Sequence, residues 1–597
     1  TTKSESPEGT VSYSYDKYGN VTSETLPDGN VWKYTWTASG ELLSETDPLG
    51  RTTTHTVDGQ GLTTSTIRPD GSVLKYTYTE GGDLATVTHP SGAIERFSYD
   101  DRGNLTEHSS PAGRITRYAY DAANRMVSST DPAGSVTTYG YDAGDRMVSS
   151  IDPLGRVTSY TYNANGQPLT ETAPDGGITT FTWDTGTRLA TVTDPEGGVT
   201  AYIYNTEDAV TSITDPLGGA TKYRVDPMGR ATQVTDPLGG VWDVTLDQAG
   251  RATKHTDPEG RANKTGYDEL GQVVSETDGE GGTWEYVYDA VGNLTEATDP
   301  EGGKATYTYD DLDRLIETVD PDGRVTSTEY DADGHQIAII DPVGGTTGYT
   351  VDADGVILTV TNALGNTTTV EHDAAGNITA QIDPLGNRIE LEYDAAGQLV
   401  LSRDANGGET RFEYDAAGRQ STITDPAGNR TEQRYDKAGR TVATVDASGD
   451  TTQYAYDKAG RQISTTDPEG RQVRYSYDDA GQLVKVVEGD TELSGTTQYA
   501  YTKAGELASI TDPRGGVSSY EYDRAGRLTT RKDAAGVVSN TGYDKIGRVV
   551  SERNGAGQSR GYTYSKGGLI TESSSPTGTT SYEYDGAGRP VVMRDPE

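Results

Sequence analysis

The chain has 597 residues, a formal net charge of −42 and no cysteine; only 32% of its residues are apolar, and the mean hydropathy is −0.68. This negative charge argues against a nucleic-acid partner and against an anionic membrane surface, because both would repel it. Disulfides, thiolate chemistry and cysteine-ligated zinc are excluded, and no apolar run approaches the 18 residues that a membrane-spanning helix needs.

One motif recurs along nearly the whole chain with a period of 21 residues. Its clearest marker is an Asp that follows Tyr, which keeps one phase from Asp16 to Asp478 and resumes that phase after a shift of three residues near Glu488. A fixed period of this length indicates a repeat array. We therefore expect one domain over residues 1–597, with about 28 units and a register slip at about 486–498. Since the chain starts inside a turn-like segment and stops where other repeats continue with Gly, we also expect both ends to be cut from a longer polypeptide.

The first half of each repeat predicts a tight turn followed by a strand. In the segment Asp152-Pro153-Leu154-Gly155, Asp suits the first position of a type I turn, Pro presets φ at the second, and Gly accepts positive φ at the fourth. Residues 156–162 then alternate β-branched and aromatic side chains, as a strand with two different faces does. A second short strand, such as residues 189–193, precedes the next turn. Each repeat should therefore be a hairpin that continues into a meander.

The second turn of the repeat, as in residues 414–418, has a glycine position that we expect to need positive φ. The residues that replace Gly there are Asn124, Asp145, Asp208, Asp313 and Thr187. Because Asn and Asp tolerate the left-handed conformation best among non-glycine residues, this pattern predicts a glycine-containing bulge that closes a short loop. The glycines that we expect to shape the two turns include Gly19, Gly103, Gly155, Gly418, Gly460 and Gly526.

Aromatic residues occupy two alternate positions of the first strand in most repeats. Representative pairs are Tyr118 and Tyr120, Tyr160 and Tyr162, Tyr286 and Tyr288, Tyr475 and Tyr477, and Tyr520 and Tyr522. In a stacked array these side chains would lie above one another as a ladder and supply most of the buried area. The alternative is a platform of exposed rings that binds sugars. Packing is favoured, because the same positions also accept Val225, Leu246 and Val351, which cannot stack on a sugar ring.

Pairing of these hairpins predicts an all-β fold, a continuous spiralling antiparallel sheet that forms a hollow shell or part of one. At a strand spacing of about 4.8 Å the strip would be roughly 270 Å long. With a guessed diameter of ~50 Å, this length gives fewer than two turns. Two alternatives are a pair of seven-bladed β-propellers, with two repeats in each four-stranded blade, and a narrow β-solenoid filament.

These motifs resemble the YD repeat of the Rhs family. The resemblance rests on Tyr-Asp-x-x-Gly-Arg, as in residues 414–419 and 456–461, alternating with Asp-Pro-x-Gly-Arg, as in residues 152–156 and 467–471, and it covers essentially the whole chain. Similar proteins include bacterial polymorphic toxins, the BC component of insecticidal toxin complexes, and animal teneurins. The resemblance implies a cocoon that encloses a C-terminal toxin domain in the toxins and presents adhesive surfaces in teneurins. The family's self-cleaving C-terminal segment has no counterpart in this sequence, so no cleavage site is carried over.

No residue pattern in the sequence indicates catalysis or cofactor binding. The six His are dispersed without a metal-binding spacing, and no Gly-x-Ser-x-Gly nucleophile motif occurs. Residues 331–334 and 352–355, both Asp-Ala-Asp-Gly, resemble the start of a calcium loop, but they lack the remaining ligands and coincide with the repeat's turn. We therefore predict no catalytic residue, no metal site and no cofactor.

An array without a catalytic motif favours a structural function. We expect the non-catalytic shell of a secreted or injected Rhs-type toxin, which would encapsulate a C-terminal toxin domain absent from this sequence. The expected partners are that enclosed polypeptide and the flanking plug domains of the parent protein, with no nucleic acid and no membrane span. The expected location is outside the bacterial cell or on its surface. The alternative is a cell-surface adhesin or fibre that binds surface glycans or partner cells.

Overall fold

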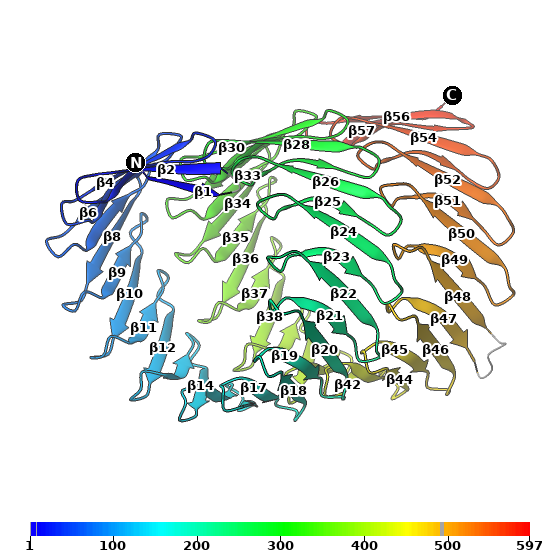
Figure 1. Cartoon of the computed structure of the whole chain (residues 1–597), viewed down its shortest axis with the longest axis horizontal. Helices are drawn as coiled ribbons and strands as arrows, with labels where there is room; N and C mark the ends of the chain where they lie inside the picture. The colour runs from blue at the N-terminus through cyan, green and yellow to red at the C-terminus, as the bar shows by residue number, and fades with distance from the viewer. Residues whose placement is uncertain (1, 7–8, 490–494, 597) are drawn as a thin grey trace.

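The computed structural model describes residues 2–6, 9–489 and 495–596, and over these residues the chain folds as one antiparallel sheet of 57 strands without a helix (Figure 1). Each strand pairs with the strands before and after it in sequence, as β15, β16 and β17 do. The predicted continuous antiparallel sheet is confirmed. The separate closed blades of a propeller are not present in the described part of the chain.

The strands fall into three groups, of which the first two each correspond closely to one turn of the spiral and the third is shorter. The first group comprises β1 (Thr2–Ser6), β2 (Gly9–Tyr15), β3 (Val21–Thr25), β4 (Val31–Trp36), β5 (Leu42–Thr46), β6 (Thr52–Val57), β7 (Thr63–Ile67), β8 (Val73–Tyr78), β9 (Leu84–Thr88), β10 (Ile94–Tyr99), β11 (Leu105–Ser109), β12 (Ile115–Tyr120), β13 (Met126–Thr130), β14 (Val136–Tyr141), β15 (Met147–Ile151), β16 (Val157–Tyr162), β17 (Pro168–Thr172), β18 (Ile178–Trp183), β19 (Leu189–Thr193), β20 (Val199–Tyr204), β21 (Val210–Thr214), β22 (Ala220–Val225), β23 (Ala231–Thr235) and β24 (Val241–Leu246). The second group comprises β25 (Ala252–Thr256), β26 (Ala262–Tyr267), β27 (Val273–Thr277), β28 (Thr283–Tyr288), β29 (Leu294–Thr298), β30 (Lys304–Tyr309), β31 (Leu315–Val319), β32 (Val325–Tyr330), β33 (Gln336–Ile340), β34 (Thr346–Val351), β35 (Ile357–Thr361), β36 (Thr367–His372), β37 (Ile378–Ile382), β38 (Arg388–Tyr393), β39 (Leu399–Arg403), β40 (Glu409–Tyr414), β41 (Gln420–Thr424), β42 (Arg430–Tyr435), β43 (Thr441–Val445), β44 (Thr451–Tyr456), β45 (Gln462–Thr466), β46 (Gln472–Tyr477), β47 (Leu483–Glu488) and β48 (Thr496–Tyr501). The third group comprises β49 (Leu507–Thr511), β50 (Val517–Tyr522), β51 (Leu528–Lys532), β52 (Val538–Tyr543), β53 (Val549–Arg553), β54 (Ser559–Tyr564), β55 (Ile570–Ser575), β56 (Gly578–Tyr584) and β57 (Pro590–Arg594).

Two kinds of loop alternate along the sheet. We call the loop after each Tyr-Asp pair, such as residues 436–440, a YD loop, and the loop in the other half of the repeat, such as residues 194–198, a DP loop. Hairpins closed by a YD loop carry a β-bulge beside the loop, as at Ala119 and Tyr120, whereas the DP hairpins beside it pair without a register shift. Because the two kinds of loop lie at opposite ends of the strands, each turn of the sheet has a YD edge and a DP edge.

The sheet winds into a spiral whose turns meet edge to edge. Strands contact only their sequence neighbours in the described residues, and the turns touch through their loops. The separation between hydrogen-bonded partners on adjacent turns ranges from 238 residues, for Arg114 and Asp352, to 262, for Arg51 and Asp313. One turn therefore takes about 250 residues, or about 12 repeats.

This winding corrects the expected number of turns. About 24 strands spaced at about 4.8 Å give a circumference near ~115 Å and a diameter of about 35–40 Å. The guessed diameter of ~50 Å was too large, so the chain makes more than two turns rather than fewer than two. In Figure 1 successive parts of the spiral lie side by side along the horizontal axis, from blue at the left through green to orange at the right.

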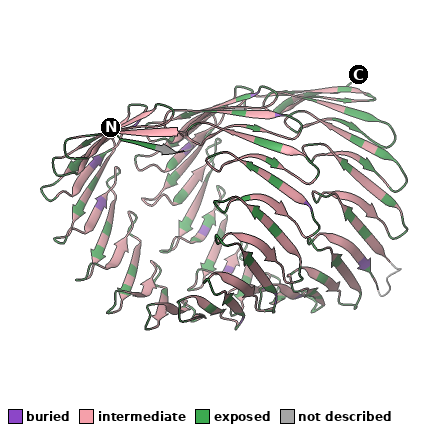
Figure 2. Cartoon of the chain, in the orientation of Figure 1, coloured by how far each residue is buried: buried purple, intermediate pink, exposed green. Residues whose placement is uncertain are grey.

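The wall is a single sheet with almost no buried core. The accessible surface is 31927 Å², whereas a compact protein of 63.6 kDa would expose about 20,000 Å². No large side chain in the described residues is fully buried, and Figure 2 shows mainly half-buried and exposed positions along every row of strands. A hollow wall with solvent on both faces explains why the accessible surface exceeds that of a compact protein.

Part of the predicted register slip, residues 490–494, lies outside the described residues. Among the residues that are described, none belongs to a helix long and apolar enough to cross a membrane.

Candidate functional site: the loop clasps and the seam between turns

Each YD loop is closed by its own Asp. In the loop 436–440, Asp436 Oδ1 accepts hydrogen bonds from the main-chain N–H of Ala438 at 3.0 Å and of Arg440 at 2.9 Å. Gly439 has φ 83° and donates its N–H to the Asp436 carbonyl, which only a residue tolerant of positive φ can do without strain. The loop is therefore fixed by local hydrogen bonds before any contact with the rest of the wall.

The Arg at the end of the YD loop clasps one repeat to the next. Arg440 donates Nε to Asp436 Oδ2 at 2.7 Å and Nη1 to the carbonyl of Asp457, one repeat further on, at 3.1 Å. Its guanidinium lies over the ring of Tyr456, 4.9 Å from the ring centroid, in the range of a cation–π contact. Tyr456 in turn donates its hydroxyl to the carbonyl of Thr441 at 2.6 Å. The Tyr-Asp-x-x-Gly-Arg motif is thus one hydrogen-bonded unit that links successive hairpins.

Among the described residues the same clasp recurs in ten repeats between Arg125 and Tyr564. Arg lies over a Tyr of the following repeat in the pairs Arg125–Tyr141, Arg146–Tyr162, Arg188–Tyr204, Arg251–Tyr267, Arg314–Tyr330, Arg419–Tyr435, Arg440–Tyr456, Arg461–Tyr477, Arg527–Tyr543 and Arg548–Tyr564. Within this chain, Arg ends a YD loop only when the loop begins with Asp. When Asn begins it, as at Asn163 and Asn205, the last residue is Gln167 or Ala209. The residue type at the last position of a YD loop therefore varies together with the residue type at its first position.

We expect Tyr456→Phe to lower the free energy of unfolding by about 1 kcal/mol, because it removes one part-buried hydrogen bond while keeping the ring under Arg440. Urea denaturation followed by tyrosine and tryptophan fluorescence measures this change. Tyr18→Phe is the matched control, since the Tyr18 side chain is 57% exposed. Equal effects at the two positions would contradict a role for the Tyr456 hydroxyl.

The glycines and tyrosines singled out from the sequence hold defined places in the repeat. Positive φ occurs at Gly19, Gly103, Gly155, Gly418, Gly460 and Gly526, and also at the five replacements Asn124, Asp145, Thr187, Asp208 and Asp313, with φ between 61° and 67°. The ten tyrosines of the ladder are half-buried. The second Tyr of a pair bonds a carbonyl 15 residues earlier, as Tyr162, Tyr288, Tyr477 and Tyr522 do. Nothing in the repeat pattern alone indicates these hydroxyl contacts.

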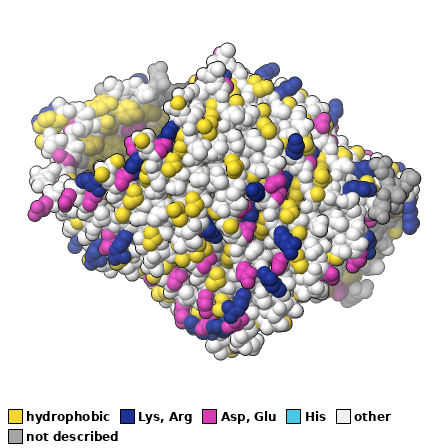
Figure 3. All heavy atoms as spheres, turned by 90° about the horizontal axis from the view of Figure 1, so that it is seen from below, with side chains coloured by type: hydrophobic (Ala, Val, Ile, Leu, Met, Phe, Trp, Pro, Cys, Tyr) yellow, Lys and Arg dark blue, Asp and Glu magenta, His cyan; other side chains and the backbone are white. Residues whose placement is uncertain are grey.

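The two faces of the sheet differ in exposure. Tyr202 and Tyr204 are half-buried, whereas Ile203 between them is 56% exposed on the opposite face. On that opposite face Thr and Ser side chains bond across strands, as Thr161 does to Thr170 at 2.6 Å. Side chains crowd on the concave face of a curved sheet and spread on the convex one, so we infer that the tyrosines face inward. Figure 3 agrees, because the hollow at its upper left is coloured mostly as hydrophobic.

Acidic side chains of the DP loops bond to the YD loops of the next turn. Glu196 accepts the main-chain N–H of Lys437 at 3.1 Å, Glu259 that of Lys503 at 2.9 Å, and Glu280 that of Arg524 at 2.7 Å. Each acceptor holds the same position in its DP loop, and each donor is the second residue of a YD loop. The edges of adjacent turns therefore match repeat by repeat along a line that we call the seam.

Glycine at the end of a DP loop lets the turns approach closely. A Cβ at Gly198 would collide with the carbonyl oxygen of Lys458 on the next turn, and one at Gly177 would lie 2.7 Å from the carbonyl oxygen of Lys437. Gly198 and Gly177 are both buried. At these positions the turns can lie against each other because Gly has no side chain, rather than because a hydrogen bond joins them.

Where Arg replaces that Gly, the seam is closed by charge. Arg51 pairs with Asp313 at 2.9 Å, and Arg114 pairs with Asp352 at 2.6 Å and with Asp354. Asp354 also accepts the main-chain N–H of Ala112 at 2.8 Å. The Asp-Ala-Asp-Gly segment that resembled a calcium loop is therefore a seam acceptor. Sequence reasoning missed this role, since nothing in a single repeat shows which loop lies opposite.

The register slip leaves the seam pattern intact. Before the slip the Glu–Lys partners are 241 residues apart, and after it the same kind of partner is 244 residues apart. The difference is the three inserted residues. Since the donor and acceptor positions are unchanged, the insertion is accommodated at the DP edge between β47 and β48 and does not shift the winding.

Hydrogen bonds within the loops lower the pKa of an Asp, and burial together with a hydrogen bond raises the pKa of a Tyr. Hydrogen bonds from the Asn104 side chain and main chain lower the pKa of Asp100 to about 2. Burial and a hydrogen bond to Glu276 raise the pKa of Tyr286 to about 12. A lowered Asp pKa contributes stability above its unfolded value of 3.8, and this stability is lost as pH falls through the folded value. A raised Tyr pKa contributes stability below 10.0, and this stability is lost as pH rises through the folded value.

We therefore expect a melting temperature that is flat between about pH 4 and pH 10, falls as pH drops from about 4 to 2, and falls again as pH rises from about 10 to 12. Calorimetry across this range at constant ionic strength measures it. A marked fall between about pH 7 and pH 5 would contradict this expectation, because it would place the stabilising titrations on other groups.

No group of three or more His, Asp and Glu side chains able to hold a metal ion occurs in the described segments. His108 Nε2 lies 2.6 Å from Glu95 Oε1 and stacks on Phe97, which makes it part of the inward face.

Two family models match the chain. The RHS repeat model matches residues 1–31, 15–52, 57–94, 99–136, 127–157, 147–178, 162–200, 183–221, 435–472, 456–493, 494–538, 543–580 and 564–597. The teneurin YD-shell model matches residues 241–420. The repeat model alone covers more than half of the chain. No curated protein sequence is significantly similar to it.

Solved structures of toxin complexes share the fold. The crystal structure of TcdB2-TccC3 superimposes with a TM-score of 0.63 at 14% identity, over 97% of this chain and 42% of the other. The same complex without its hypervariable C-terminal region gives 0.60 at 14% identity, over 96% and 40%. A Photorhabdus luminescens Tc holotoxin pore gives 0.52 at 13% identity, over 96% and 41%. The chain spans about two fifths of these solved chains, and at such identities the likeness shows the fold alone.

Proposed function

The chain belongs to the RHS repeat family, and we propose that its repeats form the non-catalytic wall of a shell that encloses a toxin polypeptide encoded C-terminal to the array. The observation that carries this proposal is the spiral itself, a single-layer wall about 35–40 Å across. Because clasps link successive hairpins and adjacent turns meet along the seam, the wall forms a barrier. A barrier is useful only if it separates the contents of the shell from its surroundings.

The chemistry of the inner face supports a container. The inward positions hold half-buried rings, and the second Tyr of a pair donates its hydroxyl to a carbonyl of the wall, as Tyr162 and Tyr456 show. Such a surface is apolar over most of its area and offers few free charges to a cargo. The convex face carries the ion pairs that keep the outside wetted, for example Arg388–Glu371 and Arg403–Glu409.

We place the docking edge for a plug domain at the DP loops that follow the last seam contacts. Leu364 and Leu385 in these loops are 86% and 88% exposed, whereas Leu154, Leu217 and Leu238, at the same loop position within the seam, are 46%, 48% and 53% exposed. Within the seam, the Leu at this loop position is half-covered by the next turn. We therefore propose that a partner also covers the edge at which Leu364 and Leu385 are exposed.

Replacing Leu364 and Leu385 with Asp is expected to leave unfolding of the array unchanged within about 0.5 kcal/mol, because both side chains are exposed. In the full-length parent protein the same change should open the shell, so that added protease digests the C-terminal polypeptide several-fold faster. Met228→Asp, a similarly exposed change in a YD loop at the opposite end of the spiral, should have no such effect. Equal digestion rates in all variants would refute the docking edge.

The container function itself is tested by protease protection in the full-length parent protein. The polypeptide after the array should survive protease in the intact protein and should be degraded once the wall is unfolded by denaturant. Degradation at the rate of the isolated polypeptide, with the wall still folded, would disprove enclosure. A shell of this kind acts outside the producing cell, so we also propose secretion or surface display.

The alternative, an adhesin that binds glycans along the tyrosine ladder, has less support. A ladder ring that is half-buried and bonded through its hydroxyl leaves little free surface for a sugar. A sugar site on this wall would therefore need a location other than the ladder.

A further inference from the structure

Among the described residues, a guanidinium lies between consecutive YD loops at every step but one from residues 394–398 to residues 585–589. In the regular clasp it belongs to the Arg that ends the preceding YD loop; elsewhere it belongs to an Arg that ends a DP loop one turn earlier. The first kind comprises Arg419, Arg440, Arg461, Arg527 and Arg548, and the second comprises Arg156, Arg261 and Arg324.

The two kinds of Arg bring the guanidinium to the same place, beside the glycine of the following YD loop. A Cβ at Gly460 would lie 4.0 Å from Nη1 of Arg440, which is the clasp Arg of the preceding loop. A Cβ at Gly418 would instead lie 2.6 Å from Nη1 of Arg156, which reaches across the seam and donates to Gln398 Oε1 at 2.6 Å. Either turn can therefore supply the group that links two YD loops.

The exception is the step between the YD loops of residues 478–482 and 502–506, where neither turn supplies an Arg. The first loop ends in Gln482, and the DP loop that faces it from the earlier turn ends in Gly240. A Cβ at Gly505 would lie 3.5 Å from Gln482 Oε1 and near no guanidinium. This Oε1 atom is buried and has no hydrogen-bond partner among the described residues. Since buried polar atoms without a partner are rare in folded proteins, the oxygen indicates a missing donor.

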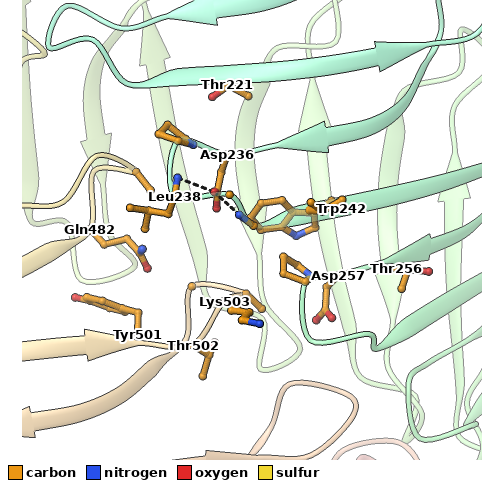
Figure 4. Close-up of a pocket in the computed structure, with 18 of the residues that line it drawn as sticks. Thr221, Asp236, Leu238, Trp242, Thr256, Asp257, Gln482, Tyr501, Thr502 and Lys503 are labelled. Atoms are coloured by element: carbon orange, nitrogen blue, oxygen red, sulfur yellow. Dashed lines mark hydrogen bonds between the residues drawn. The ribbon is translucent and has the colours of Figure 1, made fainter.

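A recess with a volume of about 960 Å³ lies at this step of the seam. It is lined by the DP loops of residues 236–240 and 257–260 and by the YD loops of residues 480–482 and 502–505. Cavities that hold small organic ligands have volumes of about 300–1,000 Å³. Figure 4 shows Asp236 from the earlier turn and Gln482 and Tyr501 from the next turn around the same space. The recess therefore has room for a side chain that the wall does not supply.

The groups that surround a clasp Arg elsewhere also line the recess. Arg440 lies over the ring of Tyr456 and donates to the carbonyl of Asp457. Tyr501 and Thr502 hold these two positions of the repeat and line the recess. An aromatic face and a carbonyl oxygen are therefore already in place for a guanidinium.

Two further acceptors match those of Arg156. That guanidinium donates to Asp152 Oδ2 in its own loop and to Gln398 Oε1 across the seam. Asp236 and Gln482 hold the same positions in their loops, and neither Asp236 Oδ2 nor Gln482 Oε1 has a partner among the described residues. A guanidinium suits both oxygens, because it is planar, always charged and carries five N–H donors.

Lys503 beside the recess is compatible with a second cation. Its side chain is exposed, so its charge is in contact with solvent. Lys458 holds the same position of the loop that follows Arg440, and Lys545 that of the loop that follows Arg527. The wall therefore already places a lysine next to a clasp guanidinium.

We propose that this recess binds the guanidinium group of an arginine that does not belong to the wall. The plane of the guanidinium would lie over the ring of Tyr501. Its N–H groups would donate to Gln482 Oε1, Asp236 Oδ2 and the carbonyl oxygen of Thr502. The two possible sources of the group are an arginine side chain of a polypeptide and a free arginine derivative. Either would complete the clasp at the step where the seam lacks it.

The test is calorimetric titration of the intact chain with the peptide acetyl-Gly-Ser-Arg-Ser-Gly-amide and with the same peptide that carries citrulline in place of arginine. Citrulline keeps the shape of arginine but has no charge. The arginine peptide should bind saturably and about tenfold or more tightly than the citrulline peptide, because hydrogen bonds to a charged group contribute about 1.5–3 kcal/mol and 1.4 kcal/mol is tenfold. Nα-acetylarginine amide is titrated in parallel to distinguish a free derivative from a polypeptide.

Gln482→Arg should abolish this binding, because the new side chain can form the regular clasp with Asp478 at the start of its loop. The substitution is compatible with folding, since Arg holds this position in many other repeats. Asp236→Asn, which keeps an acceptor oxygen for the loop but removes the charge, should weaken binding severalfold.

Gln272→Arg is the matched control, since its YD loop also begins with Asp and ends in Gln and does not line the recess. It should leave the affinity unchanged. The proposal fails if neither arginine compound binds saturably, if the citrulline peptide binds as tightly as the arginine peptide, or if Gln482→Arg binds as wild type does.

The comparison of the two arginine compounds assigns the source of the guanidinium. Tighter binding of the peptide than of Nα-acetylarginine amide would support the proposal and assign the recess to a polypeptide. Equal affinities would also support it and would assign the recess to a free arginine derivative. None of these outcomes bears on whether the shell encloses a cargo, because the array alone is titrated.

Discussion

Replacing Asp436 with alanine is expected to lower the stability of the surrounding repeats by about 3–5 kcal/mol. The change leaves the N–H groups of Ala438 and Arg440 without an acceptor inside the loop, and it removes the partner of a guanidinium that is only 19% exposed. The Arg440 N–H is part-buried whereas that of Ala438 is exposed; an unsatisfied buried donor costs about 1–3 kcal/mol, and a buried ion pair that loses one member costs about 3–5 kcal/mol. Hydrogen exchange should show faster exchange in β41 to β46.

The matched control is Asp436→Asn. Asn163 closes its own loop by accepting the N–H of Asn165 at 2.9 Å and of Gln167 at 3.1 Å, so an amide oxygen can replace the carboxylate as the loop acceptor. The Asn variant should therefore keep the loop hydrogen bonds and lose only the ion pair with Arg440, so it should be less destabilised than the Ala variant by about 1–3 kcal/mol. If both variants were equally destabilised, the loop hydrogen bonds would contribute nothing beyond the charge.

Gly198→Val is expected to force adjacent turns apart. The new Cβ would collide with the Lys458 carbonyl oxygen on the next turn and with the carboxylate of Asp194, and Gly198 is buried. Overpacking of this kind costs about 1–3 kcal/mol, and the strain is relieved most easily at the seam, which has loop contacts only. Trypsin should therefore cut after Lys437 and Lys458 at least tenfold faster than in wild type.

Gly59→Ala is the control for that experiment. A Cβ at Gly59 meets nothing within 4 Å, and other repeats place Ala or Lys at the same position of the YD loop. It should change neither the melting temperature nor the cleavage rate. Cleavage of Gly198→Val at the wild-type rate would mean that the seam tolerates a gap, and close approach of the turns would not be needed.

The local structure of each repeat could be predicted from the sequence because it depends on residues within one repeat. Thr187 shows this best, since its position among the turn glycines implied positive φ and its φ is 67°. The strand predicted over residues 156–162 corresponds to β16, Val157–Tyr162, for the same reason, namely alternation along the segment. These features need no knowledge of what lies on the next turn.

The winding and the seam could not be predicted in this way. The diameter follows from a small rotation between neighbouring strands, which no single repeat encodes and which accumulates over about 24 strands. An error in the guessed diameter therefore became an error in the number of turns. The pairing of Glu196 with Lys437 depends on that number, so the seam contacts were hidden as well.

Electron cryomicroscopy of the purified chain would show directly whether the repeats build a hollow spiral. We expect a wall one sheet thick around an open lumen, with about 12 repeats in each turn and more than two turns stacked edge to edge through their loops. A solid rod without a lumen, or rows of strands that pack face to face, would contradict it.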